Sequence, residues 1–336
     1  MNKSSQHSQS DPRIVVIGGG TGLSTMLRGL KLYSQNLTAI VTVADDGGGS
    51  GMLRSELGMP PPGDIRNCLQ ALANTEPTME ALLGYRFTEG SLAGQSFGNL
   101  FLAALNGMSR SFDEAVLKMS EVLAVTGRVL PVSNEDIRLA AEFEDGSEVF
   151  GESRISEHKT GSDRHIKRVR LIPEHPRALA ASIEAIEQAE LIVLGPGSLY
   201  TSIIPNLLVN GIADAIAQSD AVRVYVLNIM TQDGETERYR ASDHVRALME
   251  HAGGRRLFDY CLANSAPLPE AVLERYRQTD AEPTPVDEEN IRALGVTVVS
   301  APVADPAADK ARHQPLVLAG ELIRLYRDKS RTKIYI

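Results

Sequence analysis

The sequence predicts an α/β fold of the Rossmann-like, doubly wound kind, with a mainly parallel sheet and a small antiparallel β insertion. Three observations favour this fold class. Short apolar, β-branched runs recur along the chain, stretches with helical spacing separate them, and glycine-rich loops follow two of the runs. Strands that alternate with helices are typical of βαβ units, whose strands pair in parallel.

The first expected strand covers residues 13–17, and an amphipathic helix is expected over residues 23–32. Residues 37–44 are apolar almost throughout, as expected for a parallel strand that helices cover on both faces. Further strands are expected at 190–194, 222–227, 258–263 and 296–301, and helices at 177–188 and 242–251.

The stretch from about 139 to 172 departs from this alternation. Asp145 and Gly146 stand between two alternating segments in LAAEFEDGSEVFGE, which is typical of a β-hairpin. We therefore expect an antiparallel insertion here. Its second half carries a basic cluster, for which a solvated strand face and a phosphate or partner site both stay open: Lys159, Arg164, Lys167, Arg168 and Arg170.

The chain has 336 residues, of which 43% are hydrophobic and 23% are charged, so it can bury a sizeable core. No linker rich in Pro, Ser or Gly divides it. We expect a disordered polar tail over residues 1–10 and one domain over residues 11–330. Because the tail lacks the apolar segment of a signal peptide and no stretch is long enough for a membrane span, a cytoplasmic protein is expected.

Charge and motifs exclude several function classes. The formal net charge is −9, whereas binding to nucleic-acid phosphates requires a basic face, so no nucleic-acid partner is expected. Cys68 and Cys261 have neither CxxC spacing nor a nearby His cluster, which excludes a Cys/His metal framework. The motif GxxxxGK[ST] is absent, which excludes nucleotide hydrolysis of the P-loop kind.

Two glycine-rich loops are the candidate phosphate-binding elements. Each follows an expected strand and opens a helix, where backbone N–H groups can hold a phosphate. The residues concerned are Gly18, Gly19, Gly20, Thr21 and Gly22 in the first loop, and Gly195, Pro196, Gly197, Ser198 and the nearby Thr201 in the second. Leu23 stands where the dinucleotide fingerprint requires Gly or Ala, which weakens an NAD(P)-dehydrogenase assignment. A tight turn without a ligand is the alternative.

Polar side chains gather at other loop-to-helix junctions. Asp45 and Asp46 follow the second strand and are candidates for ribose hydroxyls or for Mg²⁺ held against phosphates, with turn formation and helix capping as the alternative. The other candidate base, sugar or supporting contacts are Asp64, Arg66, Asn67, Ser96, Asn99, Asn228 and Thr231. Helix capping also accounts for Asp64 and Ser96.

Six long motifs in order, GGGTGLS, ADDGGGSG, PPGDIRNCL, GQSFGNL, GPGSLYTSIIPNLLV and NIMTQDGET, resemble the YvcK-like gluconeogenesis-factor family. The resemblance extends from about Arg13 to about Arg312, and the family is related to 2-phospho-L-lactate transferases of the CofD type. It implies a UDP-sugar ligand such as UDP-N-acetylglucosamine, with the two glycine loops as phosphate sites. It also implies contacts from Tyr276 in LERYRQ and Arg312 in KARHQP.

Three functions stay open. The first, which the resemblance implies, is a regulatory UDP-sugar-binding protein that requires no cofactor. Such a protein is linked to growth on gluconeogenic carbon, cell shape and peptidoglycan precursor supply. Its candidate partner is a peptidoglycan-precursor enzyme. The second is a CofD-like transferase of a phosphorylated group from a nucleotide, with Mg²⁺ on Asp45, Asp46 or Asp64. The third is an NAD(P)-binding protein. A homo-oligomer is compatible with each, and in each the glycine loops should face one cleft.

Overall fold

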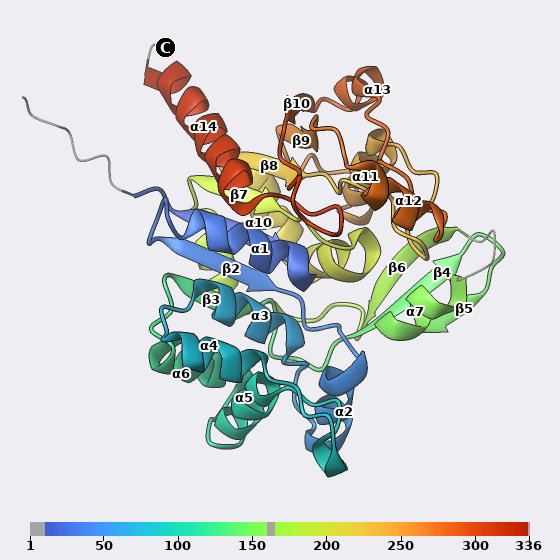
Figure 1. Ribbon diagram of the computed structural model, residues 1–336. Coiled ribbons are helices and arrows are strands. Elements are labelled where there is room, and N and C mark those ends of the chain that lie inside the picture. The colour runs from blue at the N-terminus through green and yellow to red at the C-terminus, as the bar shows by residue number, and fades with distance from the viewer. Residues whose placement is uncertain (1–10, 160–164, 335–336) are drawn as a thin grey trace, which may run out of the picture.

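A computed structural model describes residues 11–159 and 165–334 (Figure 1). Seven parallel strands form its larger sheet, in the order β10-β9-β8-β7-β1-β2-β3. They are β1 (Ile14–Gly18), β2 (Leu37–Val41), β3 (Arg128–Pro131), β7 (Leu191–Leu194), β8 (Val222–Val226), β9 (Tyr260–Asn264) and β10 (Thr297–Ala301). The predicted doubly wound α/β fold is confirmed, and the tail predicted over residues 1–10 lies outside the described residues.

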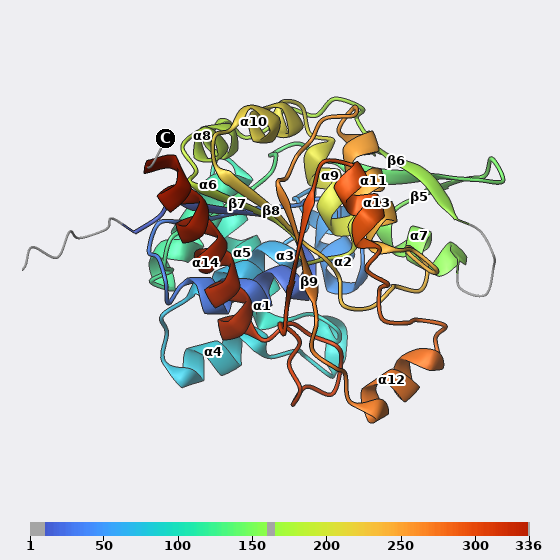
Figure 2. The same cartoon turned by 90° about the horizontal axis from the view of Figure 1, so that it is seen from above.

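Helices cover both faces of this sheet (Figure 2). One face carries α1 (Gly20–Leu30), α3 (Gly63–Leu72) and α14 (Pro315–Ile334); the other carries α8 (Ala180–Glu187), α9 (Ile204–Leu207), α10 (Ile212–Gln218) and α11 (Ala241–His251). The other helices are α2 (Gly48–Leu57), α4 (Pro77–Gly84), α5 (Phe97–Gly107), α6 (Phe112–Val122), α7 (Glu152–Lys159), α12 (Glu270–Arg277) and α13 (Glu288–Ala293), with a 3₁₀ turn η1 (Gly90–Leu92) and a π turn η2 (Leu199–Ile203). Among the described residues, no helix combines the length and the apolar character needed to cross a membrane.

The central strands explain the apolar runs in the sequence. Every residue of β1, β2, β7 and β8 is buried, because each strand has a neighbour on both sides and helices on both faces. The sequence did not predict β3. Its four residues, RVLP, end in a proline, which cannot donate to a ladder and is tolerated because β3 is an edge strand.

The predicted β insertion is present as a three-stranded antiparallel sheet in the order β5-β4-β6. It comprises β4 (Arg138–Phe143), β5 (Glu148–Phe150) and β6 (Ile166–Ile172), and α7, which the sequence did not predict, lies between β5 and β6. Lys167, Arg168 and Arg170 pair with glutamates of β4 and β5 across the strands. This part of the basic cluster is therefore a solvated, ion-paired strand face. Arg164 and the side chain of Lys159 lie outside the described part.

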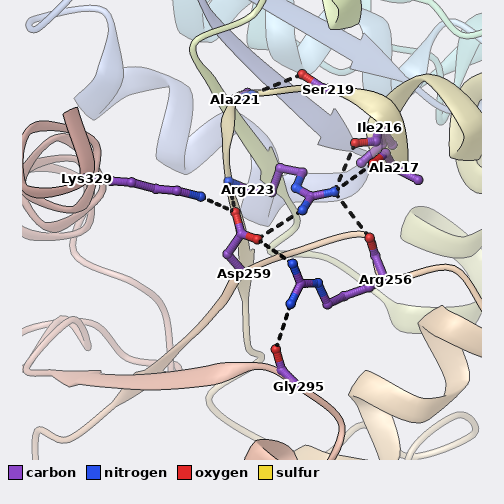
Figure 3. Close-up of polar contacts among 9 residues, drawn as sticks. All are labelled: Ile216, Ala217, Ser219, Ala221, Arg223, Arg256, Asp259, Gly295 and Lys329. Carbon is purple, nitrogen blue, oxygen red and sulfur yellow. Dashed lines mark hydrogen bonds and ion pairs between the residues drawn. The ribbon is translucent and has the colours of Figure 1, made fainter. Parts of the chain in front are cut away.

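A network of charged groups attaches α14 to the sheet (Figure 3). Asp259, just before β9, accepts from Arg223 Nη2 of β8 at 3.0 Å and from Lys329 Nζ of α14 at 2.7 Å. Arg223 also donates to the carbonyl oxygens of Ile216 and Ala217 at the end of α10. The carboxylate thus connects two strands with the last helix of the described chain.

The other attachment of α14 is its close contact with α1. A Cβ atom added to Gly29 of α1 would lie 2.0 Å from the carbonyl oxygen of Pro315, the first residue of α14. Only a residue without a side chain therefore allows α14 to pack at this distance.

We expect Gly29→Ala to lower the free energy of unfolding by about 1 to 3 kcal/mol, because the methyl group overpacks a backbone contact. The helix propensities alone predict the opposite sign, a gain of about 1 kcal/mol. Urea unfolding followed by far-UV circular dichroism measures the difference. The control is Gly107→Ala at the end of α5, where an added Cβ meets nothing within 4 Å. If both variants are at least as stable as the wild type, the close contact between α1 and α14 is wrong.

Candidate functional site

The two glycine loops leave neighbouring strands at the centre of the sheet. β1 pairs with β7 on one side and with β2 on the other, and the strand order proceeds outward from β1 and β7 in opposite directions. The loop after β1 and the loop after β7 therefore begin side by side at the carboxyl edge. In wound sheets, ligands bind at this switch point.

Both loops line one cleft with a volume of about 310 Å³. Ten of the residues singled out from the sequence line it: Gly20, Thr21, Gly22, Pro196, Gly197, Ser198, Asn228, Thr231, Tyr276 and Arg312. Seven others line it as well: Thr25, Ser202, Ile229, Met230, Gln232, Ala311 and His313. Segments more than 250 residues apart in the sequence are thus brought to one site.

Glycine is required at Gly20 and at Gly22 for different structural reasons. Gly20 has a φ of +71°, in the left-handed region that favours glycine, and an added Cβ would meet only the Ser202 hydroxyl, at 3.8 Å. Its position therefore faces open space, where a ligand can approach the backbone. Gly22 is needed for close approach, since an added Cβ would lie 2.8 Å from the carbonyl oxygen of Pro196 in the other loop.

Side chains after β8 hold the second glycine loop. Asn228 Nδ2 donates to the carbonyl oxygen of Gly197 at 2.9 Å, and the Ser198 hydroxyl donates to Gln232 Oε1 at 2.9 Å. Thr201 is different from the other predicted loop residues, because its buried hydroxyl donates to Glu235 Oε1 at 2.8 Å and it does not line the cleft. In this structure Thr201 therefore holds the loop to Glu235 and does not face the cleft.

Tyr276 of α12 and Arg312, in the segment between β10 and α14, reach the same cleft as the glycine loops. His313 stands beside Arg312 and was missed in the sequence, where its only signal is the Arg-His pair. It is 8% exposed, and its Nε2 has no hydrogen-bond partner among the described residues. Burial lowers the pKa of His313 to about 4, so the imidazole is neutral at pH 7.

A group of carboxylates adjoins the first glycine loop. Asp64, in the first turn of α3, accepts a hydrogen bond from the backbone of Gly20 and another from the side chain of Asn67. Burial, with the nearby charge of Asp45 adding to it, raises the pKa of Asp64 to about 6. A carboxylate therefore already lies at the N-terminus of α1, and an incoming phosphate would have to bind farther along the loop, toward Thr21 and Gly22.

The β insertion contributes to this acidic group. Asp46 Oδ1 accepts from the backbone N–H of Ser153 at 2.9 Å and so caps the first turn of α7. Glu152, the first residue of α7, was not predicted from the sequence. Its pKa is raised to about 8, chiefly by burial and then by the charge of Asp45. The capping explanation considered for Asp46 therefore agrees with the structure.

The remaining predicted residues lie away from the cleft and hold the neighbouring helices. Ser96 caps α5 by accepting from the backbone N–H of Asn99 at 3.3 Å. Asn99 Oδ1 accepts from Arg66 Nε at 3.2 Å, which commits both side chains to each other. Gly18, Gly19 and Gly195 shape the loops without lining the cleft, and Asp64 Oδ2 would lie 2.6 Å from a Cβ added to Gly19.

Comparison with known proteins identifies the family. The sequence profile described as "2-phospho-L-lactate transferase CofD" matches residues 14–304. This chain belongs to the CofD family. Among its relatives, the proteins named "Gluconeogenesis factor" from Halalkalibacterium halodurans and Bacillus subtilis are 51% and 47% identical, over 85% and 94% of this chain and 88% and 99% of their own lengths.

Solved structures agree with this assignment. A crystal structure of a Bacillus halodurans protein, 47% identical to this CofD-family chain, superposes with a TM-score of 0.90 and covers 94% of this chain and 100% of its own. The resemblance to gluconeogenesis factors that the motifs predicted is therefore confirmed.

The sequence made Asp45 and Asp46 candidates for holding a magnesium ion. Within residues 11–159 and 165–334, no three His, Cys, Asp or Glu side chains form a set that could hold a metal ion. Asp45 accepts from the N–H of Gly47 at 2.8 Å, whereas Asp46 is turned to α7, so the two do not converge. These side chains alone do not fit a resident Mg²⁺, which would need phosphate and water oxygens for most of its ligands.

The raised pKa of Glu152 makes the stability of this CofD-family protein depend on pH. The folded state holds the Glu152 proton more tightly than the unfolded chain does, so stability falls as the pH rises from about 4.5 to about 8. Because one unit of pKa corresponds to about 1.4 kcal/mol, we expect Glu152→Gln to be more stable than wild type at pH 8 by at least about 1 kcal/mol. Urea unfolding at pH 5 and pH 8 measures this.

The control for this experiment is Glu157→Gln, a change at an exposed glutamate of the same helix. It should leave the pH dependence of the wild type unchanged. Equal pH dependence of Glu152→Gln and wild type would mean that Glu152 is not buried against the other carboxylates.

Proposed function

We propose that this protein binds a UDP-sugar such as UDP-N-acetylglucosamine in the cleft between the two glycine loops, and that it acts as a regulatory protein. The observation that carries the proposal is that both glycine loops, Arg312 and Tyr276 line the same cleft. A diphosphate needs backbone N–H groups and a cation, and a uridine needs an aromatic or apolar face.

The cleft offers each of these groups. Backbone N–H groups around Thr21 and Gly22, at the start of α1, and around Gly197 favour an anion. Arg312 supplies a permanent positive charge and Tyr276 an aromatic face. The neutral imidazole of His313 donates to the backbone of Leu227, so its Nε2 can accept one hydrogen bond from a hydroxyl or amide group of the ligand.

The names of the relatives and the motif resemblance support a proposal for the cellular role. Relatives about half identical to this chain carry the name "Gluconeogenesis factor". We propose that the protein works in the cytoplasm, that it is needed for growth on gluconeogenic carbon, for cell shape and for peptidoglycan precursor supply, and that its partner is a peptidoglycan-precursor enzyme. Binding of the UDP-sugar would be the signal that such a regulator reads.

A second candidate is a CofD-like, Mg²⁺-dependent transferase of a phosphorylated group from a nucleotide. The observation that favours it is the carboxylate of Asp64 at Gly20, with Asp45 nearby. One or two carboxylates together with substrate phosphates are a common environment for Mg²⁺. A strong magnesium dependence of ligand binding would favour this candidate.

Calorimetry with the full chain distinguishes the candidates. The ligands are UDP-N-acetylglucosamine, UDP-glucose, GDP and NAD(P), each with and without Mg²⁺. The proposal expects the UDP-sugars to bind most tightly and without a metal requirement. Preference for GDP with Mg²⁺ would favour the transferase, preference for NAD(P) a dinucleotide-binding protein, and absence of UDP-sugar binding would contradict the proposal.

Arg312→Ala is expected to weaken UDP-N-acetylglucosamine binding by about ten- to a hundredfold, since hydrogen bonds to charged groups contribute about 1.5–3 kcal/mol.

Tyr276→Ala should weaken the binding of UDP-sugars and leave the binding of inorganic pyrophosphate unchanged, because the ring would contact the uridine only. Calorimetry measures both. The control is Arg275→Ala on α12, whose exposed side chain pairs with Asp309 outside the cleft. Unchanged affinity in both cleft variants would mean that the ligand binds elsewhere.

A further inference from the structure

A second pocket adjoins the cleft at the same edge of the sheet. Its volume is about 320 Å³, and it lies beyond the ends of β8 and β9, against α12. Asn228 and Ile229 line both the pocket and the cleft, so the two lie next to each other at these residues. A ligand whose diphosphate lies in the cleft therefore has this pocket beside it.

The walls of this pocket are uncharged and mostly apolar. Two prolines and two leucines contribute to them, Pro267, Leu268, Leu273 and Pro283, and every described residue that lines the pocket is uncharged. The side chain of Asn264 is used internally, because its Oδ1 accepts from two backbone N–H groups and its Nδ2 donates to a carbonyl oxygen. Such walls favour a flat, uncharged ring over a charged group.

One polar group in the pocket is unsatisfied. Thr284 lines the pocket and is 8% exposed, and its hydroxyl has no hydrogen-bond partner among the described residues. Its backbone N–H donates to the carbonyl oxygen of Ile229 at 3.0 Å, which fixes it beside the cleft. A buried hydroxyl without a partner is unfavourable, and a ligand that supplies the missing hydrogen bond removes this cost.

We propose that this pocket binds the nucleobase of the nucleotide whose diphosphate occupies the cleft, an inference that rests on the proposed function. A pyrimidine has two apolar faces, which suit the proline and leucine walls, and an edge of amide-like donors and acceptors, which suits the hydroxyl of Thr284. A hexose would bury several hydroxyl groups, for which the pocket offers few partners. The base therefore fits the pocket better than the sugar does.

Tyr276 agrees with this arrangement. It lies one helical turn after Leu273 on α12, so the same face of this helix lines the cleft through Tyr276 and the pocket through Leu273. The nucleoside would thus pass Tyr276 at the cleft and end with its base beside Thr284.

Two variants of the full chain test the proposal, with UDP, UDP-N-acetylglucosamine and inorganic pyrophosphate as probes. Thr284→Val removes the hydroxyl and keeps the shape; we expect it to weaken UDP binding about three- to tenfold and to leave pyrophosphate binding unchanged. Thr297→Val, at an exposed residue of β10 outside the pocket, is the matched control. Calorimetry measures these affinities.

The second variant is a fluorescent reporter. The chain contains no tryptophan, so Val286→Trp, at a residue of the pocket that is 40% exposed, introduces a single one. UDP should change its emission saturably, because the base would lie against the ring, whereas pyrophosphate should not.

The outcomes separate this inference from the proposed function. If wild type binds UDP but the reporter does not respond and Thr284→Val binds UDP normally, the inference is wrong and the proposed function stands. A response to UDP-N-acetylglucosamine but not to UDP would assign the pocket to the sugar and overturn the inference, as would an equal response to pyrophosphate. If wild type binds neither UDP nor UDP-N-acetylglucosamine, both the inference and the proposed function are wrong.

Discussion

Gly20→Val is expected to weaken the binding of UDP-N-acetylglucosamine, NAD(P) and pyrophosphate alike, by at least about a hundredfold. Gly20 lines the cleft, and its missing side chain leaves open space in which only the Ser202 hydroxyl lies within 4 Å. A valine would stand where a phosphate approaches the backbone. Hydrogen bonds to a charged group contribute about 1.5–3 kcal/mol each, so losing two of them gives an effect of this size.

The control for this variant has to carry the same backbone strain. Gly146, in the turn between β4 and β5, also has a positive φ, +82° against +71° for Gly20, and an added Cβ there meets nothing within 4 Å. Gly146→Val should therefore cost similar stability and leave ligand affinity unchanged. Calorimetry measures affinity, and thermal unfolding verifies that both variants are folded. A folded Gly20→Val protein with wild-type affinity would show that the phosphates bind elsewhere.

Asp259→Ala is expected to lower the free energy of unfolding by about 3 to 5 kcal/mol. The side chains of Arg223 and Asp259 are only 10% and 15% exposed, so removing the carboxylate leaves a buried guanidinium without its counter-charge. Lys329 of α14 loses its partner in the same change. Urea unfolding measures the loss, and limited proteolysis should detect earlier release of α14.

An exposed ion pair is the matched control for this experiment. Glu288→Ala removes the partner of Arg292 on α13, where both side chains are more than half exposed, and should cost less than about 1 kcal/mol. Burial alone would raise the pKa of Asp259, but hydrogen bonds from Lys329 and Arg223 outweigh it and lower the pKa. Its stabilisation is therefore present near neutral pH and lost in acid. Equal stability of the two variants would contradict the role of this network.

The fold was largely predictable because its signals are local. Runs such as IVVI and LTAIV are apolar at nearly all positions, which is the pattern expected of strands that helices cover on both faces. The hairpin between β4 and β5 was predictable from Asp145-Gly146, whose turn conformation depends on the two residues themselves. β3 and α7 were missed because one is a four-residue edge strand and the other has a weak apolar face.

The site was only partly predictable. Glycine loops are recognisable because close backbone approach demands glycine, and both lie on the cleft. The sequence could not distinguish polar side chains that bind a ligand from those that hold the fold. Thr201, Ser96 and Asn99 have the same kinds of donors and acceptors as ligand-binding residues. Their observed partners, Glu235 among them, lie up to tens of residues away.

By itself, the sequence determined the alternation of the central strands with helices, the glycine loops at the ends of two strands and the family of the chain, because each of these is encoded in short contiguous segments. The resemblance already assigned Tyr276 and Arg312 to the same ligand as the glycine loops. Only the tertiary structure added His313 to that cleft, turned Asp46 to α7, and brought Asp64 and Glu152 near the charge of Asp45. The reason is that burial, charge proximity and hydrogen-bond pairing depend on three-dimensional neighbours, and these come from distant parts of the chain.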